Sequence, residues 1–275
     1  MIKWSMVIDL DRCAACQACT FACMAENNQP AVGPEEARKR RIHSWNQILS
    51  FELEGIKVPV PRPCMQCEIP ACVRVCPTGA RFYYDKGGVV LQSYDRCIGC
   101  RECMGACPYN ANFFRWLKYP PENVEEFDKY RNPDIVIVPG LGRVGPPPKI
   151  LGVVEKCTFC IHKLVKLRKD LKEGNAGALS SIFRPGPITW ETVGKAIDIL
   201  MRYLLDPSSI DIELFGWEIW YLPACVASCP TRARIFGNIE DPNSLVSQLA
   251  VSGRAFRLLE EMGTKPKVIY LAPRR

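Results

Sequence analysis

No apolar run in this sequence of 275 residues is long enough to cross a bilayer, which takes roughly 18–20 residues in a helix. Residues 1–12 also lack the apolar centre and the cleavage site of a secretory signal, and they contain no twin-arginine motif. We therefore expect the chain to have neither a signal peptide nor a transmembrane helix of its own.

The sequence also lacks any grouping of acid, base and nucleophile that is typical of a catalytic site. Its two histidines are His43 and His162. We expect His43, which lies in a predicted strand without a ligand partner nearby, to be structural. His162 follows Cys160 by two residues, but four cysteines already complete a metal site there, so we do not expect it to bind metal. The chain is therefore predicted to have no catalytic residue and to bind no small-molecule substrate.

What the sequence has in abundance is cysteine. Sixteen cysteines divide into four groups of four, with none left over. Two groups lie within residues 64–107 and each ends in Cys-Pro; the second has the spacing Cys-x2-Cys-x2-Cys-x3-Cys-Pro of bacterial ferredoxins that hold two clusters. Residues 13–23 repeat this rhythm with Met24 in place of the proline, and the fourth group is split between residues 157–160 and 225–229.

This spacing suits cubane [4Fe-4S] clusters, which need four thiolates each. Two-residue gaps let three cysteines of one loop reach three corners of a cubane, while the fourth cysteine points away to the neighbouring cluster. Four clusters with crossed ligands are therefore predicted. Their ligands are set A, Cys13, Cys16, Cys19 and Cys229; set B, Cys23, Cys157, Cys160 and Cys225; set C, Cys64, Cys67, Cys72 and Cys107; and set D, Cys76, Cys97, Cys100 and Cys103.

Zinc sites, disulfides and free thiols are the alternatives for these cysteines. A zinc site uses cysteine pairs set well apart and gains nothing from a third and a fourth cysteine in one run. A disulfide framework needs an oxidising compartment and is typical of short secreted chains. Free buried cysteines would not gather in regular runs. Iron–sulfur clusters are the favoured interpretation.

The formal net charge of +7 would by itself suggest a polyanionic partner. A cubane with its four thiolates carries a net charge of about −2, so four cubanes would offset this basic excess. No motif of basic and aromatic residues supports nucleic-acid binding either, and none is expected.

An internal repeat relates the split group to the central one. Residues 76–82 (Cys-Pro-Thr-Gly-Ala-Arg-Phe) match residues 229–235 (Cys-Pro-Thr-Arg-Ala-Arg-Ile) at most positions. We therefore predict an α+β fold of two ferredoxin-like units, one inserted in the other, with loop and helical insertions. The predicted parts are an outer unit, 1–60 and 149–240 with an insertion at 161–224; an inner unit, 61–118; a proline-rich connection, 119–148; and a C-terminal tail, 241–275.

Local patterns predict the individual elements. The expected strands are two within 42–60, a hairpin around residues 85–88, and a terminal strand at 267–271. The expected helices are 161–173, 192–205, 241–251 and 254–262, whereas 27–41 is expected to be loop and charged surface.

Aromatic residues flank the cysteine loops and are expected to shield the clusters from water. They are Tyr83, Tyr84, Phe113, Phe114 and Trp116. Residues 214–223 (LFGWEIWYLP) are expected to be core or a cover over a nearby cluster, with a partner- or membrane-facing patch as the alternative.

Taken together, these segments resemble the four-cluster iron–sulfur subunits of the dimethyl sulfoxide reductase superfamily of molybdopterin enzymes. The resemblance covers nearly the whole chain. It is strongest at CMQCEIPACVRVCPTGA (64–80), DRCIGCRECMGACPYNA (95–111), VVEKCTFC (153–160), CVASCPTRARIFG (225–237), FGNIEDPNS (236–244) and GTKPKVIYL (263–271).

The resemblance implies that the chain relays single electrons between a large catalytic subunit, which holds molybdopterin with molybdenum or tungsten, and a membrane- or quinone-linked partner. The catalytic subunit would lie near set A, and a membrane anchor subunit or other acceptor near set D. The complex would be membrane-associated on the cytoplasmic side, or would be exported together with a signal-bearing partner.

The resemblance also implies the same crossed ligation. Some relatives lack one cysteine of the third run and carry a three-iron cluster, but all four are present here, so we expect four cubanes. The 64 residues between Cys160 and Cys225 depart from shorter relatives and leave the partner contacts of this region open.

Two alternative functions are open. The first is another electron-transfer protein with similar clusters, either an iron–sulfur subunit of a quinol-oxidising or hydrogenase complex or a standalone polyferredoxin carrier. A molybdopterin subunit purified alongside the chain would distinguish the family's function from this alternative. The second is a non-redox interaction protein stabilised by zinc or disulfides, which metal and acid-labile sulfide analysis would detect.

Overall fold

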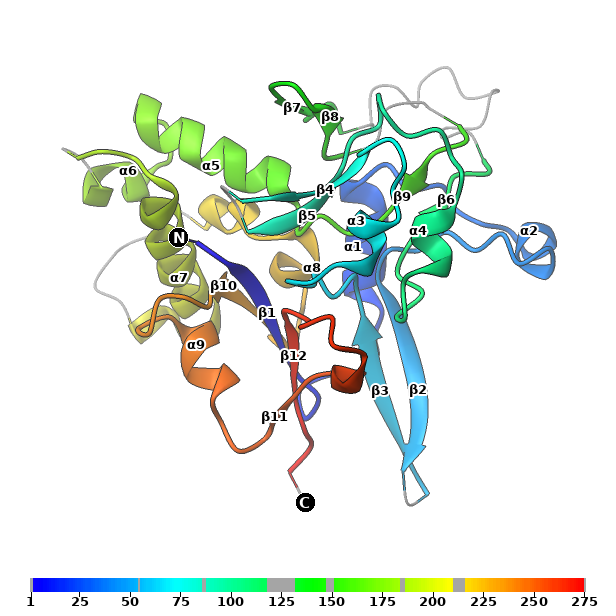
Figure 1. Ribbon diagram of the computed structural model, residues 1–275. Coiled ribbons are helices and arrows are strands. Elements are labelled where there is room, and N and C mark those ends of the chain that lie inside the picture. Colours follow the sequence, from blue (N-terminus) through cyan, green and yellow to red (C-terminus); the bar gives the residue numbers. More distant parts are fainter. Residues whose placement is uncertain are drawn as a thin grey trace.

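The computed structural model describes residues 2–274 except residue 54 and residues 86–87, 118–131, 147–150, 184–185 and 210–215. The chain combines helices with small, mostly antiparallel sheets, in agreement with the α+β prediction (Figure 1). Within the described ranges, no helix has both the length and the hydropathy of a membrane span.

The largest sheet joins the two ends of the chain. Its strand order is β10-β1-β12-β11, with β1 (Trp4–Asp9) parallel to β12 (Val268–Leu271) and antiparallel to β10 (Arg234–Asn238). The short β11 (Ala255–Phe256) forms the other edge, antiparallel to β12. All residues of these three strands are buried, which is typical of strands covered on both faces. The predicted terminal strand is thus confirmed, and it lies beside the first strand of the chain.

The other described strands form antiparallel pairs. The predicted hairpins within 42–60 and around residues 85–88 are both confirmed, although residue 54 and residues 86–87 of their turns lie outside the described residues. The pairs are β2 (Gln47–Leu53) with β3 (Ile56–Arg62), β4 (Arg81–Tyr84) with β5 (Val89–Gln92), β6 (Phe113–Phe114) with β9 (Val154–Glu155), and β7 (Val136–Val138) with β8 (Gly142–Val144).

Two longer helices come from the predicted insertion at 161–224. Helix α5 (Ile161–Glu173) has the predicted bounds and ends where Gly174 takes a left-handed φ of 85°, as glycine does at helix C-termini. Helix α7 (Trp190–Leu205) begins two residues before the predicted start, because Thr189 closes a capping box there. The predicted apolar face of α7 is buried and consists of Val193, Ile197, Leu200 and Leu204.

The remaining described helices are short. Four of them carry cysteines of the predicted sets: α1 (Ala18–Glu26), α3 (Ala71–Arg74), α4 (Glu102–Gly105) and α8 (Ala224–Ala227). The others are α2 (Pro34–Arg38), α6 (Ala178–Phe183), α9 (Leu245–Ala250) and the 3-10 helices η2 (Pro207–Ser209), η3 (Trp217–Tyr221) and η4 (Glu260–Met262).

The predicted helix at 254–262 is wrong. Residues 255–256 form strand β11 (Ala255–Phe256), which pairs with the end of β12, and only the short η4 turn follows. The open edge of the terminal sheet offers hydrogen bonds that local helix propensity does not foresee. The predicted helix at 241–251 is shorter than expected, because Ser244 caps α9 and the chain before it turns.

Two further segments differ from their expected loops. Residues 27–41 contain the short helix α2, which begins with Pro34 in its first turn, where a missing N–H costs nothing. Half of the predicted proline-rich connection at 119–148 lies outside the described residues, and residues 132–146 contain the β7–β8 pair.

One continuous core links the terminal sheet to the cysteine loops. Trp4 of β1 stacks on Phe236 of β10 with ring centroids 5.2 Å apart, and Phe236 contacts the edge of Phe159 at 5.4 Å. Since Phe159 directly precedes Cys160, the apolar core continues into the loop that carries this cysteine. Helices α7 and α9 pack on β10 and cover the sheet on the left of Figure 1.

Candidate iron–sulfur sites

The four cysteine groups share one backbone feature. In each group the residue just before the second cysteine has a positive φ: Ala15 (55°), Gln66 (49°), Gly99 (70°) and Phe159 (55°). This conformation is unfavourable for residues with a Cβ, and at Gly99 a Cβ would also collide with the carbonyl of Gly152. Left-handed residues in tight loops turn successive N–H groups inward and create concavities that bind anions. The shared conformation therefore suits loops that enclose an anionic group.

Backbone N–H groups point at several of the sulfurs. Four such N–H···S bonds, with N to S distances of 3.3–3.5 Å, run from Arg81 to Cys76, from Ala233 to Cys229, from Val154 to Cys97 and from Phe159 to Cys157. Burial alone would raise the pKa of Cys76, but the N–H of Arg81 and the hydroxyl of Thr78 lower it below its ordinary value. Donors of this kind favour the thiolate, which is the form that binds iron.

Cysteines from distant parts of the chain lie together. Burial and the neighbouring thiols of Cys157, Cys160 and Cys225 raise the pKa of Cys23 well above its ordinary value. A second such neighbourhood joins the two ends of the chain and contains Cys13, Cys19 and Cys229.

The two central groups also approach each other. Burial raises the pKa of Cys67 to about 12 and that of Cys72 to about 11, and the thiols of Cys64 and Cys107 add to the effect at both. One small cavity is lined by the remaining four cysteines, Cys76, Cys97, Cys100 and Cys103.

None of the sixteen cysteines forms a disulfide in this structure, and only Cys16 and Cys100 are exposed. No three His, Cys, Asp or Glu side chains within the described residues converge closely enough to hold a single metal ion. A cubane places four irons and four sulfides between its thiolates, so its ligands stand further apart than those of one ion. The donors, soft thiols that come together from several parts of the chain, have the chemistry that iron–sulfur clusters need.

Buried arginines occupy equivalent positions in the internal repeat. Arg81 and Arg234 each lie five residues after the last cysteine of their run, and each is 1% exposed. Arg81 donates from Nη2 to Cys103 Sγ at 3.5 Å, and Arg234 donates from Nη2 to Cys19 Sγ at 3.4 Å. Burial disfavours the charge, but the neighbouring thiolates outweigh it and raise the pKa of both guanidinium groups. The sequence-based prediction missed these contacts, although the matching arginines of the repeat were a signal for them.

Lys156, directly before Cys157, is a third buried cation. It is fully buried, and its ammonium group donates to the carbonyls of Val90 and Cys157, the latter at 2.9 Å. Burial lowers the pKa of Lys156, and the thiolates of Cys64 and Cys72 act in the opposite direction. Within the described part of the chain, none of these three cations forms an ion pair with a carboxylate.

Comparison with known proteins agrees with this arrangement. The 4Fe-4S dicluster domain family matches residues 57–123. The iron–sulfur cluster-binding subunit of menaquinone reductase from Nitratidesulfovibrio vulgaris is 38% identical, over 99% of this chain and 90% of the relative. A subunit of selenate reductase from Mesobacillus selenatarsenatis is 35% identical, over 98% of this chain and 72% of the relative. A subunit of polysulfide reductase from Wolinella succinogenes is 28% identical, over 99% of this chain and 96% of the relative. This protein belongs to the iron–sulfur subunits of the dimethyl sulfoxide reductase superfamily.

Membership in this iron–sulfur subunit family confirms the predicted role. The protein is an electron-transfer subunit of an oxidoreductase, and it binds [4Fe-4S] clusters through its cysteines. Its own residues fix the loops, donate hydrogen bonds to sulfur and exclude water, and these are the features through which a protein sets the potential of a cluster.

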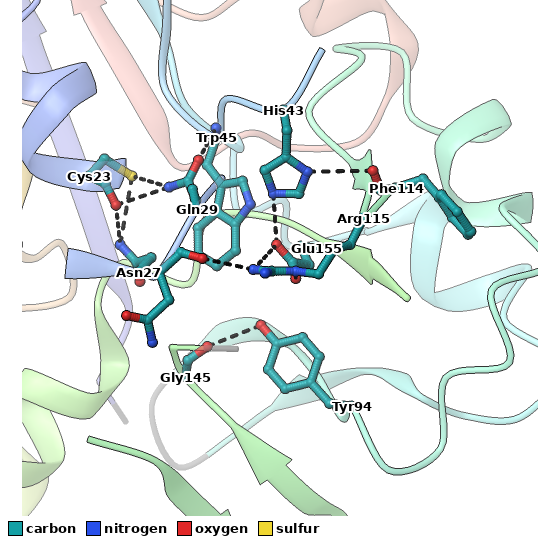
Figure 2. A network of polar contacts seen from close by, with 11 residues as sticks. Cys23, Asn27, Gln29, His43, Trp45, Tyr94, Phe114, Arg115, Gly145 and Glu155 are labelled. Atoms are coloured by element: carbon teal, nitrogen blue, oxygen red, sulfur yellow. Dashed lines mark hydrogen bonds and ion pairs between the residues drawn. The ribbon is translucent and has the colours of Figure 1, made fainter. Parts of the chain in front are cut away.

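A buried polar network surrounds Cys23 and the β6–β9 pair (Figure 2). Gln29 donates from Nε2 to Cys23 Sγ at 3.2 Å, and its Oε1 accepts from the N–H of Trp45 at 2.9 Å. These contacts tie the loop after α1 to the sulfur of Cys23. The sequence did not predict them, because an amide that bonds a thiol six residues away leaves no periodic pattern.

Glu155 is the centre of the second half of this network. Its carboxylate accepts from Arg115, with one contact at 3.2 Å, and lies 2.7 Å from His43 Nε2. Burial alone would raise the pKa of Glu155, but Arg115 and His43 lower it below its ordinary value. His43 lies before β2 and not in the predicted strand, but its contacts with Glu155 and with the carbonyl of Phe114 fit the structural role that was expected of it. His162 lies against Glu26, with 2.6 Å between Nε2 and Oε1.

We expect Glu155→Gln to destabilise the cluster-loaded protein by about 3–5 kcal/mol, because it leaves the guanidinium of Arg115 buried without a counter-charge. The measurement is the urea midpoint under anaerobic conditions. The matched control is Glu173→Gln at the exposed end of α5, where the carboxylate lies 3.9 Å from Lys169 and should contribute about 0–1 kcal/mol. Equal midpoints for the two variants would contradict this account of the network.

The aromatic segment near Cys225 is divided between core and surface. Tyr221 and Leu222 are buried, which fits the expected cover, whereas Trp217 is 44% and Trp220 is 67% exposed. The ammonium group of Lys163 lies over the ring of Trp220, 5.3 Å from its centroid. Residues 214–215 of this segment lie outside the described residues.

The aromatic residues around the central loops also differ in burial. Phe113 is buried, and Trp116 is 40% exposed. The ring centroids of Phe114 and Trp116 are 4.5 Å apart. The guanidinium carbon of Arg101 lies over both rings, 5.2 Å from the centroid of Phe114 and 5.4 Å from that of Trp116. Since Arg101 directly follows Cys100, this stack covers one side of the loop of the third cysteine run.

Proposed function

We propose that sets A, B, C and D each hold one [4Fe-4S] cluster, so that the chain carries four. The observation that carries this proposal is the neighbourhood of Cys23. The side-chain amide of Asn27 donates to the sulfurs of both Cys23 and Cys160, at 3.7 Å and 3.9 Å, and the thiols of Cys157 and Cys225 are also neighbours of Cys23. A fourth cysteine that leaves its run is what crossed ligation requires. When bound, each cluster would accept and release one electron at a time.

The order of the four sets follows from the contacts between them. Cys225 of set B lies beside Cys19 and Cys229 of set A, and Cys157 of set B lies beside Cys64 of set C. Arg81 lies beside cysteines of both set C and set D. We therefore infer a linear arrangement A–B–C–D, in which A and B belong to the outer ferredoxin-like unit and C and D to the inner one.

The two ends of this line are where electrons would enter and leave. Cys16 of set A and Cys100 of set D are exposed, and so are the apolar side chains of Phe21 and Ile98 next to these loops. Electron transfer needs short distances, so partners would dock at these exposed loops. In accordance with the family, we assign a molybdopterin catalytic subunit to set A and a membrane anchor subunit or other acceptor to set D.

Quinone-linked chemistry is the second candidate for the complex as a whole. The relative that is 38% identical over 99% of this chain is a menaquinone reductase subunit, whereas the polysulfide reductase relative is 28% identical. A complex that exchanges electrons with a quinone would use the same relay of clusters.

Native anaerobic purification of the tagged chain tests the proposed partner. We expect a large subunit with molybdopterin and either molybdenum or tungsten in roughly equal amount, together with a membrane-bound subunit. Metal analysis and mass spectrometry of the purified complex give the result. A stable, fully loaded chain that purifies alone from its own cells would contradict the assignment and favour a standalone carrier.

A further inference from the structure

The three buried cations Arg234, Lys156 and Arg81 lie at the three junctions of the line of cysteine sets. Arg234 joins sets A and B, because its guanidinium donates to Cys19 Sγ at 3.4 Å and lies beside Cys225. The remaining guanidinium contacts, to Asn46 Oδ1 at 2.8 Å and Met6 Sδ at 3.5 Å, are uncharged. The nearest opposite charges of Arg234 are therefore thiolates of two different sets.

Lys156 occupies the junction between the two units. Its ammonium group donates to the carbonyl of Cys157 of set B at 2.9 Å, and the same carbonyl accepts from the side chain of Gln66, directly before Cys67 of set C, at 2.6 Å. Cys64 and Cys72 of set C are the other neighbouring thiols. Its hydrogen bonds go to two backbone carbonyls, which are also uncharged.

Arg81 occupies the junction inside the inner unit. It donates to Cys103 Sγ of set D at 3.5 Å and lies beside Cys72 and Cys64 of set C. Its Nε and Nη1 atoms are buried and have no hydrogen-bond partner within the described residues. These two donors are free to bond the sulfides or thiolates of an anionic group between the sets.

Two other buried cations within the described residues, Arg115 and Lys163, pair with carboxylates. Arg115 is as buried as Arg81 but pairs with Glu155, and Lys163 pairs with Glu26 at 3.0 Å. A buried charge without a partner is strongly unfavourable, so cations that lack a carboxylate need another anion. The three junctions are where that anion would be a reducible cluster.

We propose that Arg234, Lys156 and Arg81 are fixed positive charges, one at each step of the relay, and that each raises the reduction potentials of the two clusters beside it. This assignment rests on the ligand sets proposed above. A reduced cluster carries one more negative charge than an oxidised one, so a nearby cation stabilises the reduced form more. One cation shared by two clusters stabilises the electron on either side of the step.

The experiment is redox titration of the anaerobically purified complex, followed by electron paramagnetic resonance, for the variants Arg234→Gln, Lys156→Gln and Arg81→Gln. Each variant should lower two of the four midpoint potentials. A tenfold loss in the equilibrium constant for reduction corresponds to a shift of about 59 mV for one electron, and we expect shifts of at least this size.

The pattern of shifts is the decisive result, and it needs no assignment of signals to clusters. Arg234→Gln and Arg81→Gln should move two different pairs of midpoints with none in common. Lys156→Gln should move one midpoint from each pair. Unchanged midpoints in loaded variants, or equal shifts of all four midpoints in every variant, would overturn the proposal.

Matched controls separate charge from packing. Lys267 is a lysine of similar burial, 3% exposed, whose neighbouring thiols, Cys64 and Cys67, belong to set C alone. Lys267→Gln should therefore move one midpoint at most, and movement of two or more would count against the proposal. The exposed Lys195→Gln on α7 should move none.

A Gln variant that loses iron would give no midpoint to compare, so each position also has a charge-retaining variant. These variants are Arg81→Lys, Arg234→Lys and Lys156→Arg. If a Gln variant loses clusters and its charge-retaining partner keeps them with near-normal midpoints, the charge is the essential property. If both lose clusters equally, the side chain acts by shape and the proposal fails at that position. Iron content of the unmodified complex is measured in parallel. A normal complex without sixteen irons would refute the proposed ligand sets, whereas normal loading without potential shifts would refute only the role of the cations.

Discussion

Replacing Cys229 with alanine should damage the cluster of Cys13, Cys16 and Cys19, although these residues lie at the other end of the chain. Crossed ligation assigns Cys229 to their cluster as the fourth thiolate. Cys229 also accepts a hydrogen bond from the N–H of Ala233 at 3.3 Å, which holds its sulfur in place. Without this ligand the cubane should lose the iron at one corner or the whole cluster.

The measurement is iron content together with the electron paramagnetic resonance spectrum of the reduced complex. We expect Cys229→Ala to alter the same signal as Cys16→Ala, with the loss of about one to four irons out of about sixteen. Cys225→Ala should alter a different signal, shared with Cys23→Ala. Ser228→Ala, one residue before Cys229, is the matched control and should leave all signals in place. If Cys229→Ala and Cys225→Ala altered one and the same cluster, crossed ligation would be wrong.

Removal of the clusters should abolish the cooperative unfolding transition of the chain. Several cysteines, including Cys23, Cys64 and Cys157, belong to the apolar core that also contains Trp4 and Phe159. The three cations at the junctions would in addition lose their counter-charges. An uncompensated buried charge costs about 3–5 kcal/mol. Three of them are comparable to the whole stability of a domain, about 5–15 kcal/mol.

This is tested by chelating the iron under anaerobic, denaturant-free conditions and following near-ultraviolet circular dichroism during urea unfolding. We expect an iron-free chain without a cooperative transition, which regains the transition when iron and sulfide are restored. A chain that unfolds cooperatively at the same urea midpoint with and without iron would show that the protein core alone specifies the fold.

The cysteine spacing predicted the loops well, because the information is local. A two-residue gap constrains three thiols to one turn, and the structure shows the same left-handed residue before the second cysteine in all four groups. Helix α5 was predicted with its bounds for the same reason, since its charged face and its terminal glycine are features of neighbouring residues.

Long-range pairing could not be predicted in the same way. The strand Ala255–Phe256 was assigned to a helix because its pairing with Tyr270 and Leu271 depends on how the terminal sheet assembles. The parallel contact of β1 with β12 likewise brings the two ends of the chain together without any local signal.

The polar residues around the cysteines were missed for a related reason. Gln29, Arg115 and Glu155 act through partners at distant positions, and single polar residues have no periodicity. The contacts of Arg81 and Arg234 were also missed, although the internal repeat places both arginines at the same distance from a Cys-Pro pair. The repeat indicated a common fold for the two loops, and it also contains an arginine at the same position in both copies.

The central claim is that sixteen cysteines bind four cubanes, and the most direct measurement is the iron, acid-labile sulfide and zinc content of the intact, anaerobically purified complex. The proposed ligand sets predict about sixteen irons and sixteen sulfides per chain, with zinc absent. Mainly zinc, or fewer than about twelve irons in a fully folded sample, would contradict it.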